Sequence, residues 1–238
     1  MSDPADRVPL DSLTVLSLPE PWLLEEVAAE APDFRCVLWD LVGEPQGCAR
    51  DEVDIAVAPY DSNRWRKDPS VLRDVSLLQL QSTGYDGVPE LLGEGTALAA
   101  AGWVHAAGTA EIALGLIIAA QRELDRGVRQ QAEGVYRTYH SRAVADSRVT
   151  VVGVGEIGGA VASRLRPFEV QLTRVASSAR DDAAGHVHGT DELGEILPRT
   201  DILVLALPLT ASTVGLVDRE MLSRLPDDAL VVNVGRGP

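Results

Sequence analysis

Short apolar runs alternate with amphipathic stretches along nearly all 238 residues, and this alternation constrains the fold more than any other feature. Runs rich in Val, Leu and Ile between helical patterns are typical of βα units that build a parallel sheet covered by helices. Because the chain exceeds the usual domain size of about 100–150 residues, we expect an α/β protein with two domains, residues 1–100 and 101–238.

The expected elements follow from hydrophobic periodicity. Helices are expected at Trp22–Ala31, around Arg64–Arg73 and at Gly159–Arg166. A further helix, Thr109–Leu124, would link the domains, with Thr109 as its cap and Glu111 near the positive end of its dipole. The expected strands are Leu13–Leu18, Cys36–Trp39, Ile55–Ala58, Leu77–Leu80, Thr96–Ala99, Val149–Val152, Val170–Val175, Asp201–Leu207 and Leu230–Val234.

Charge and composition exclude several classes of partner. The 36 acidic residues outnumber the 21 basic ones, for a formal net charge of −15, so nucleic acid and anionic membrane surfaces are disfavoured. The longest apolar run, Ile112–Ala120, is too short to span a bilayer. Cys36 and Cys48 lie in no metal or redox motif, and no signal peptide opens the chain, so we expect a cytoplasmic protein. An anionic ligand would need local arginines or backbone amides.

One glycine-rich turn predicts a dinucleotide site. Gly153-Val154-Gly155-Glu156-Ile157-Gly158 follows an apolar strand and opens a helical segment, which is the context that gives this motif meaning. Gly153 permits the tight turn, Gly155 lets the backbone approach a pyrophosphate, and Gly158 lets the helix pack on the strand. A glycine-rich loop without function is the alternative interpretation.

The end of the next strand bears on the choice between NAD and NADP. NAD sites usually place an Asp or Glu there, whereas this chain has Ser177, Ser178 and Arg180, with no carboxylate before Asp181. The two hydroxyls and the guanidinium could bind a 2′-phosphate, so the sequence favours NADP over NAD. A solvated Arg180 without such a role is the ordinary alternative.

Four stretches in order resemble the D-isomer-specific 2-hydroxyacid dehydrogenases, the family of glyoxylate/hydroxypyruvate reductases and phosphoglycerate dehydrogenases. They are Gln81–Gly87, His105–Glu111, the glycine turn, and Asp201–Thr210 followed by Asn233–Gly237, and together they cover most of the chain. The resemblance implies a flavodoxin-like substrate domain and a Rossmann domain, with hydride exchange between NAD(P)H and C2 of a 2-oxo or 2-hydroxy acid. It also implies a homodimer.

The resemblance assigns roles to individual residues. Thr83 and Gly84 would bind the substrate carboxylate. Arg236, at the carboxyl end of a strand, would bind the 2-oxo acid and stabilise its oxyanion, which suits a guanidinium, although a structural salt bridge is the alternative. The cofactor would contact Thr109, Gly153, Gly155, Glu156, Ile157, Gly158, Ser177, Ser178, Arg180, Leu207, Pro208, Thr213, Val234 and Gly235.

The chain departs from the family pattern after Arg236. The family's acid/base histidine and its orienting glutamate would lie beyond this point, so we expect a C-terminally truncated Rossmann sheet with an exposed edge. His105, His140, His186 and His188 are poor substitutes, and the last two are expected in an exposed loop without a zinc site. A catalytically inactive dinucleotide-binding remnant is therefore the alternative to an active dehydrogenase.

Overall fold

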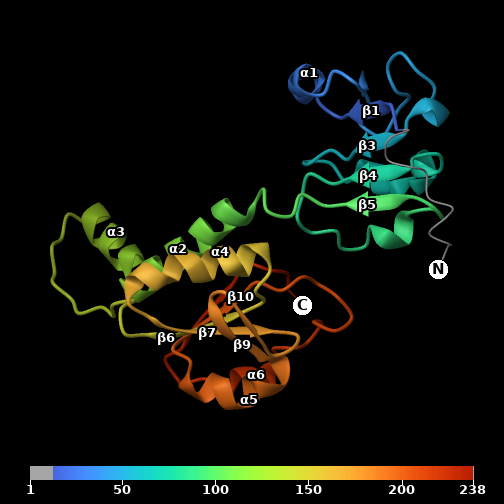
Figure 1. The fold of residues 1–238 in the computed structure, drawn as a ribbon. Helices are drawn as coiled ribbons and strands as arrows, with labels where there is room; N and C mark the ends of the chain where they lie inside the picture. The colour runs from blue at the N-terminus through green and yellow to red at the C-terminus, as the bar shows by residue number, and fades with distance from the viewer. Residues whose placement is uncertain (1–12, 238) are drawn as a thin grey trace. The chain divides into compact units, whose positions relative to one another are not determined.

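The chain divides into two compact units, Met1–Gly102 and Trp103–Pro238 (Figure 1). The structure, a computed structural model, describes residues 13–237. The division falls two residues after the boundary expected from the sequence, and the assignment of one unit to substrate and the other to cofactor stays a prediction.

The first unit contains a five-stranded sheet in which every neighbouring pair is parallel. The strand order β2-β1-β3-β4-β5 is that of flavodoxin, so the predicted fold class is confirmed. Each strand coincides with an expected one to within two residues. Their bounds are β1 Val15–Leu18, β2 Arg35–Leu38, β3 Ile55–Val57, β4 Leu77–Gln79 and β5 Ala97–Ala99.

One α-helix, α1 (Pro21–Glu30), lies in the described part of the first unit, and the expected helix around Arg64–Arg73 is wrong. Two 3-10 helices, Arg64–Lys67 and Pro69–Leu72, stand there instead. Pro69 is the reason, because it disfavours the α conformation of the residue before it, and Asp68 has φ −135° and ψ 81°. Two further 3-10 helices lie at Arg50–Glu52 and Pro89–Leu91.

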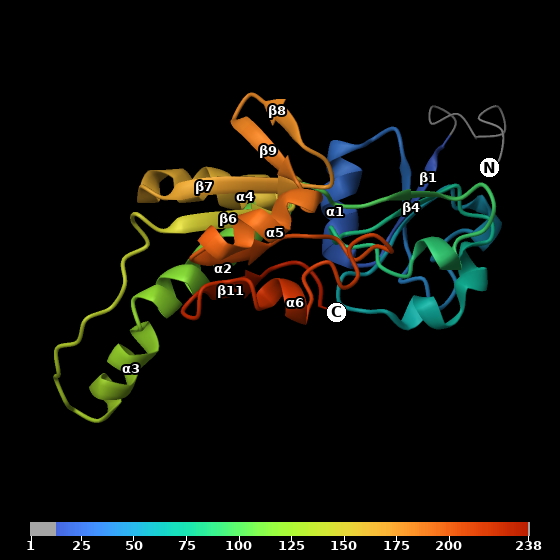
Figure 2. The ribbon, with the colours of Figure 1, turned by 90° about the horizontal axis from the view of Figure 1, so that it is seen from below.

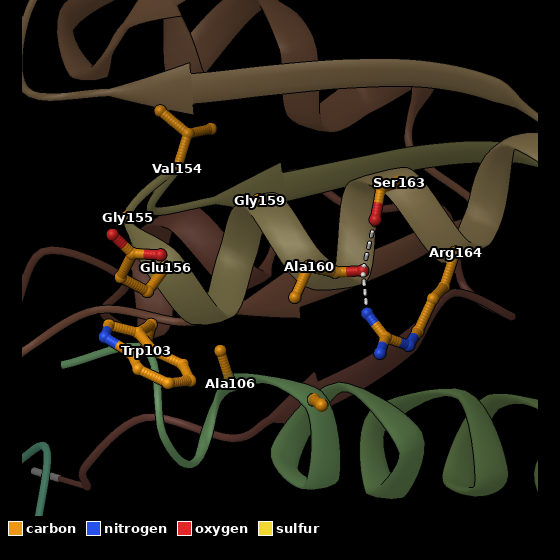
Figure 3. Close-up of a pocket in the computed structure, with 10 residues that line it drawn as sticks. Trp103, Ala106, Val154, Gly155, Glu156, Gly159, Ala160, Ser163 and Arg164 are labelled. Carbon is orange, nitrogen blue, oxygen red and sulfur yellow. Dashed lines mark hydrogen bonds between the residues drawn. The ribbon is translucent and has the colours of Figure 1, made fainter. Parts of the chain in front are cut away.

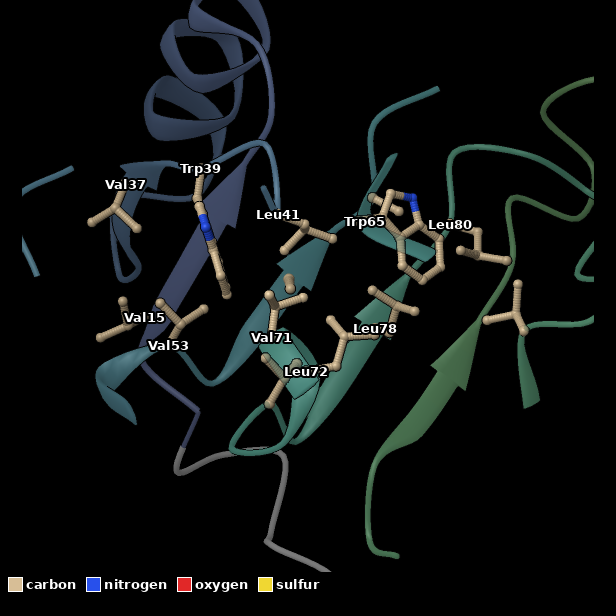
Figure 4. Close-up of a cluster of buried hydrophobic side chains, with 14 residues drawn as sticks. Val15, Val37, Trp39, Leu41, Val53, Trp65, Val71, Leu72, Leu78 and Leu80 are labelled. Carbon is tan, nitrogen blue, oxygen red and sulfur yellow. The ribbon is translucent and has the colours of Figure 1, made fainter. Parts of the chain in front are cut away.

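Aromatic and aliphatic side chains from strands and loops fill the core of the first unit (Figure 4). Trp39 and Trp65 are each 2% exposed, and Leu78 of β4 is fully buried. Leu41, Val53, Val71 and Leu72 close the cluster from segments outside the strands. Side-chain packing rather than helix docking therefore holds this sheet in place.

The second unit contains a six-stranded sheet in the order β11-β10-β6-β7-β9-β8. Its parallel strands follow the Rossmann order 3-2-1-4-5, and β8 is added as an antiparallel hairpin with β9. The expected loop around His186 and His188 is wrong, because both residues lie on β9. The bounds are β6 Arg148–Val152, β7 Gln171–Ala176, β8 Arg180–Asp182, β9 Gly185–Gly189, β10 Ile202–Leu205 and β11 Leu230–Asn233.

Helices cover both faces of this sheet (Figures 1 and 2). Successive side chains of a strand point to opposite faces of the sheet. Val149 and Val151 of β6 therefore pack against α2 and α4, whereas Val152 packs on the opposite face, against α5. The helices are α2 Ala106–Gln121, α3 Leu124–Ala132, α4 Glu156–Leu165, α5 Leu193–Ile196 and α6 Arg219–Leu222, with 3-10 helices at Arg166–Phe168, Thr190–Glu192 and Leu197–Arg199.

The start of α2 differs from the prediction. His105 occupies the N-cap, and the Thr109 amide donates to the His105 carbonyl at 3.0 Å, so Thr109 lies inside the helix and does not cap it. Glu111 then lies beyond the first turn. Glu123, with φ +49°, separates α2 from α3. No helix in the part of the chain that the structure describes has the length and apolarity needed to cross a bilayer.

Candidate functional site

The glycine turn after β6 has little room for side chains at two of its three glycines. Gly153 has φ +94°, and a Cβ there would lie 2.5 Å from the Ala206 carbonyl oxygen. A Cβ on Gly158 would collide with the Gly153 carbonyl, whereas one on Gly155 would meet nothing within 4 Å. The first and third glycines are thus required by packing, and the second faces open space. This is the arrangement that a bound pyrophosphate needs.

The same turn begins helix α4. Gly155 is the N-cap, and the first intrahelical bond runs from the Gly159 amide to the Gly155 carbonyl at 2.8 Å. The preceding amides, including those of Glu156 and Ile157, have no acceptor within the helix and lie at the positive end of its dipole. An anion is stabilised at such a helix end.

A hollow of about 560 Å³ opens beside this helix end (Figure 3). Gly155 and Glu156 line it, together with Trp103, Ser163 and Arg164. In Figure 3 the Trp103 ring lies opposite Glu156, and the Ser163 hydroxyl and the Arg164 guanidinium both donate to the Ala160 carbonyl, at 2.9 and 3.3 Å. Arg164, in the last turn of α4, adds a cation to the lining of this hollow.

The sequence did not point to Trp103, Ser163 or Arg164 as site residues. Ser163 lies seven residues after Glu156, so helical periodicity places it on the same face and could have identified it. Trp103 is 74% exposed and precedes α2, where no sequence pattern marks it.

A second hollow, of about 440 Å³, contains two predicted cofactor residues. Thr109 and Val234 line it with Val104, His105, Gly108, Ile112, Leu116 and Asn233. The structure thereby joins the start of α2 to the end of β11, which are more than a hundred residues apart in the sequence.

Arg236 lies with three other predicted residues around a third hollow, of about 100 Å³. Leu207, Pro208 and Thr213 share its lining. The Thr213 hydroxyl donates to the Pro208 carbonyl at 2.6 Å, which closes the loop after β10. Thr213 therefore has a structural role of its own.

The loop that carries Arg236 approaches its neighbour closely. A Cβ on Gly235 would lie 2.5 Å from the Leu207 carbonyl oxygen, so only glycine fits there. The Asn233 side chain accepts the Gly235 amide at 2.9 Å and donates to the Arg236 carbonyl at 3.3 Å. Asn233 is a positioning residue that the sequence prediction did not assign a role.

The residues that follow β7 are solvent-exposed. Ser177, Ser178 and Arg180 are all exposed, and the Arg180 guanidinium donates to the Ser178 carbonyl at 3.3 Å. The nearby Asp182 carboxylate accepts from Arg174 at 2.8 and 2.9 Å, and these bonds lower its pKa. The structure thus brings two hydroxyls and one guanidinium to one strand end.

Thr83 and Gly84 lie in the first unit, whereas every other predicted site residue lies in the second. The Thr83 hydroxyl is 3.2 Å from the Gly102 carbonyl oxygen, and the Ser82 hydroxyl donates to the Gly84 carbonyl at 2.8 Å. The contribution of this loop to a shared site stays a prediction.

The turn and strand order are those of Rossmann dinucleotide-binding domains in general, and the sequence match identifies the family. Residues 114–238 match the family model described as D-isomer specific 2-hydroxyacid dehydrogenase, NAD binding domain. The chain belongs to the D-isomer-specific 2-hydroxyacid dehydrogenase family.

Individual relatives agree with the family membership. A hydroxyphenylpyruvate reductase of Plectranthus scutellarioides is 33% identical over 54% of this chain and 42% of its own length. A glyoxylate/hydroxypyruvate reductase A of Arabidopsis thaliana is 34% identical with the same coverage. The chain thus spans less than half the length of these two curated relatives.

A solved structure shares the fold across both units. The D-isomer specific 2-hydroxyacid dehydrogenase of Xanthobacter autotrophicus Py2, determined with NADPH and MES, has a TM-score of 0.77 at 23% identity. The similarity covers 94% of this chain and 73% of that chain.

Proposed function

We propose that this chain binds NADPH or NADH and transfers a hydride from the nicotinamide to C2 of a small 2-oxo acid, while the C2 oxygen takes up a proton from solvent, giving the D-2-hydroxy acid and the oxidised cofactor. The observation that carries the proposal is the glycine turn, where Gly153 and Gly158 are required by packing and Gly155 faces open space. The family's NAD binding domain and the reductases among the relatives support the reaction class.

The proposed roles follow from position. The α4 N-terminus binds the pyrophosphate, while Thr109 and Val234 contact the cofactor from the hollow between the start of α2 and the end of β11. When bound, the cofactor supplies the hydride, and the protein supplies orientation and charge. Arg236 pairs with the substrate carboxylate and stabilises negative charge that develops on the C2 oxygen. Thr83 and Gly84 bind the same carboxylate through backbone amides.

Dinucleotide binding is tested with Gly155→Val. A Cβ on Gly155 meets nothing within 4 Å, so we expect the fold to be retained while the valine fills the pyrophosphate position. We expect NADPH binding, measured by calorimetry, to be lost. The matched control Gly159→Ala, also with open space around its Cβ, should bind normally. Equal NADPH affinity in Gly155→Val and the unsubstituted chain would contradict the proposal.

Hydride transfer is measured separately, as loss of nicotinamide absorbance with glyoxylate or hydroxypyruvate. Arg236→Lys keeps the charge but loses the paired contact, so we expect a large loss of turnover with NADPH affinity unchanged. NADPH binding without turnover by the unsubstituted chain would instead favour a dinucleotide-binding protein that is not an enzyme.

We propose a preference for NADP over NAD. It is supported by Ser177, Ser178 and Arg180 at the end of β7 and by the NADPH in the Xanthobacter relative. A charge-assisted bond is worth about 1.5–3 kcal/mol, so Arg180→Ala should weaken NADPH binding by about 10- to 100-fold. NADH affinity should stay unchanged, and an equal loss for both cofactors would contradict the assignment.

We also propose a homodimer. Helix α3 and the segment after it extend away from the sheet of their own unit (Figure 2). Leu124 and Val128, one turn apart on α3, are 50% and 65% exposed, and a second copy of the chain packed against α3 would bury them. Light scattering should give a dimer for the unsubstituted chain and a monomer for Val128→Asp. A dimer in both would place the interface elsewhere.

A cytoplasmic location is proposed from the thiols. Cys36 and Cys48 are both free, and burial raises the pKa of each thiol, which keeps them protonated and inert. Fractionation of the source cells with an antibody against the chain would test this location.

A further inference from the structure

Two histidines and a glutamate lie close together at the β8–β9 hairpin of the second unit. His186 and His188 belong to β9, and Glu192 ends the 3-10 helix that follows it. One potential ligand atom from each lies within 4.8 Å of the others, and no other group of three such residues does so within residues 13–237. The proposed dehydrogenase reaction uses none of the three.

The backbone explains why these residues meet. Residues two apart on a strand point to the same face, so the two imidazoles lie side by side. Their ring centroids are 4.6 Å apart in an edge-to-face arrangement. The chain then turns into the 3-10 helix, where the Gly189 amide donates to Glu192 Oε1 at 2.8 Å. This bond fixes the carboxylate beside His188, whose Nδ1 lies 2.7 Å from Oε2.

Carboxylates already orient both imidazoles. His186 Nδ1 lies 2.9 Å from Asp181 Oδ1, and His188 Nδ1 is paired with Glu192. His186 is paired through Nδ1 with a carboxylate outside the cluster and presents Nε2 for a metal, an arrangement that recurs in metal sites. An ion held by His188 Nδ1 and Glu192 Oε2 takes the place of the proton between these two atoms.

The cluster of His186, His188 and Glu192 is accessible to solvent, and hydrogen bonds hold the strand that carries the two histidines. The His186, His188 and Glu192 side chains are 50%, 33% and 38% exposed, so an ion can reach them and water can complete its coordination. β9 is held in place by Arg174, which donates to Asp182 and to the Gly185 carbonyl at 2.8 Å. Held ligands lose less entropy when the ion binds.

We propose that His186, His188 and Glu192 bind one divalent transition-metal ion, of which Zn²⁺ is the probe. Two imidazoles and one carboxylate match the ligand preference of Zn²⁺, and Ca²⁺ and Mg²⁺ prefer oxygen ligands alone. Asp181 orients His186 from outside the ligand set. The ion joins β9 to the helix after it and stabilises the hairpin.

The first experiment titrates the metal-free chain with Zn²⁺ in competition with a chromophoric chelator. We expect one equivalent to bind, with affinity lowered at least tenfold in His186→Ala and in His188→Ala. Glu192→Gln keeps an acceptor for the Gly189 amide but loses the charge, so it should also weaken binding at least tenfold. The control His140→Ala removes an exposed histidine elsewhere in the second unit and should bind as the unsubstituted chain does.

A spectroscopic readout separates ligation from a change in folding. Co²⁺ in the site should give visible absorption bands that disappear in the His186→Ala/His188→Ala double variant, while the melting temperature of that variant in chelator stays within a few degrees. Unchanged Zn²⁺ affinity in the double variant, or no binding by the unsubstituted chain, would overturn the proposal.

Discussion

The space available for a side chain differs between several glycines of the first unit and those around the glycine turn of the second. In the first unit, a Cβ on Gly43, Gly93 or Gly102 would meet nothing within 4 Å. In the second, a Cβ on Gly153 or Gly235 would lie 2.5 Å from a backbone oxygen, and Gly158 is tighter still. Both units have buried apolar cores, and the second has in addition backbone segments that approach closely around the glycine turn.

The largest expected effect is that of Gly158→Ala, because the new Cβ would collide with the backbone of the glycine turn, which cannot easily move. We expect a loss of about 4 kcal/mol, at the upper end for a single substitution, and loss of NADPH binding. Urea unfolding followed by circular dichroism measures the first.

Its matched control is Gly159→Ala, one residue further along α4. The surroundings are open there, and alanine favours a helix by about 1 kcal/mol over glycine. Equal destabilisation by both substitutions would show that the close backbone approach at Gly158 does not decide the effect.

The corresponding test in the first unit is Leu78→Ala. Leu78 is fully buried on β4, so the cavity should cost about 3 kcal/mol. NADPH affinity should remain within twofold, since the glycine turn lies in the other unit. Gly93→Ala is the control and should be neutral to within about 0.5 kcal/mol. Loss of NADPH binding in Leu78→Ala would mean that the two units do not fold independently.

A smaller effect is expected for Arg174→Met. The Arg174 side chain is 10% exposed and donates to Asp182 and to the Gly185 carbonyl, which would both lose their partner. The expected cost is about 2 kcal/mol. Arg199→Met, at an exposed position, should leave the melting temperature unchanged. Equal stability of both variants would show that the hairpin does not need this pair.

The smallest expected effect is the fall in the melting temperature of the second unit at acidic pH. Hydrogen bonds from Arg148 lower the pKa of Asp201, and those from Arg174 lower that of Asp182. A carboxyl group whose pKa is lower in the folded than in the unfolded chain stabilises the fold at any pH above its unfolded-state pKa, which is about 3.9 for Asp. This stabilisation is lost as the pH falls through the folded-state pKa. Melting temperatures should therefore fall below about pH 4, and less so in Asp201→Asn. An equal pH dependence in that variant would contradict the assignment.

Much of the fold was predictable from the sequence. Apolar runs such as Val149–Val152 identify buried parallel strands because both of their faces are covered. The glycine turn was predictable for a similar reason, since its spacing reflects local backbone geometry. The helix around Arg64–Arg73 was predicted wrongly because Pro69 breaks it locally, although Pro69 is visible in the sequence.

The candidate site was predictable only where backbone pattern marks it. Gly155 and Arg236 lie next to recognisable strands, so their positions follow from the strand order. Trp103 and Arg164 line the hollow beside α4 because α2 packs against α4, and no pattern in either segment shows that pairing. The β8–β9 hairpin was missed because its strands are short and polar.

The sequence by itself determined the α/β class, the strand order through its family pattern, and the glycine turn, because these depend on local periodicity and on the spacing of glycines. Only the tertiary structure decided which side chains meet across elements. The sequence predicted an exposed loop at His186 and His188. In the structure, β9 places both on one face, and the 3-10 helix that follows brings Glu192 beside them. Such clusters depend on contacts between segments, and local sequence patterns do not encode these contacts.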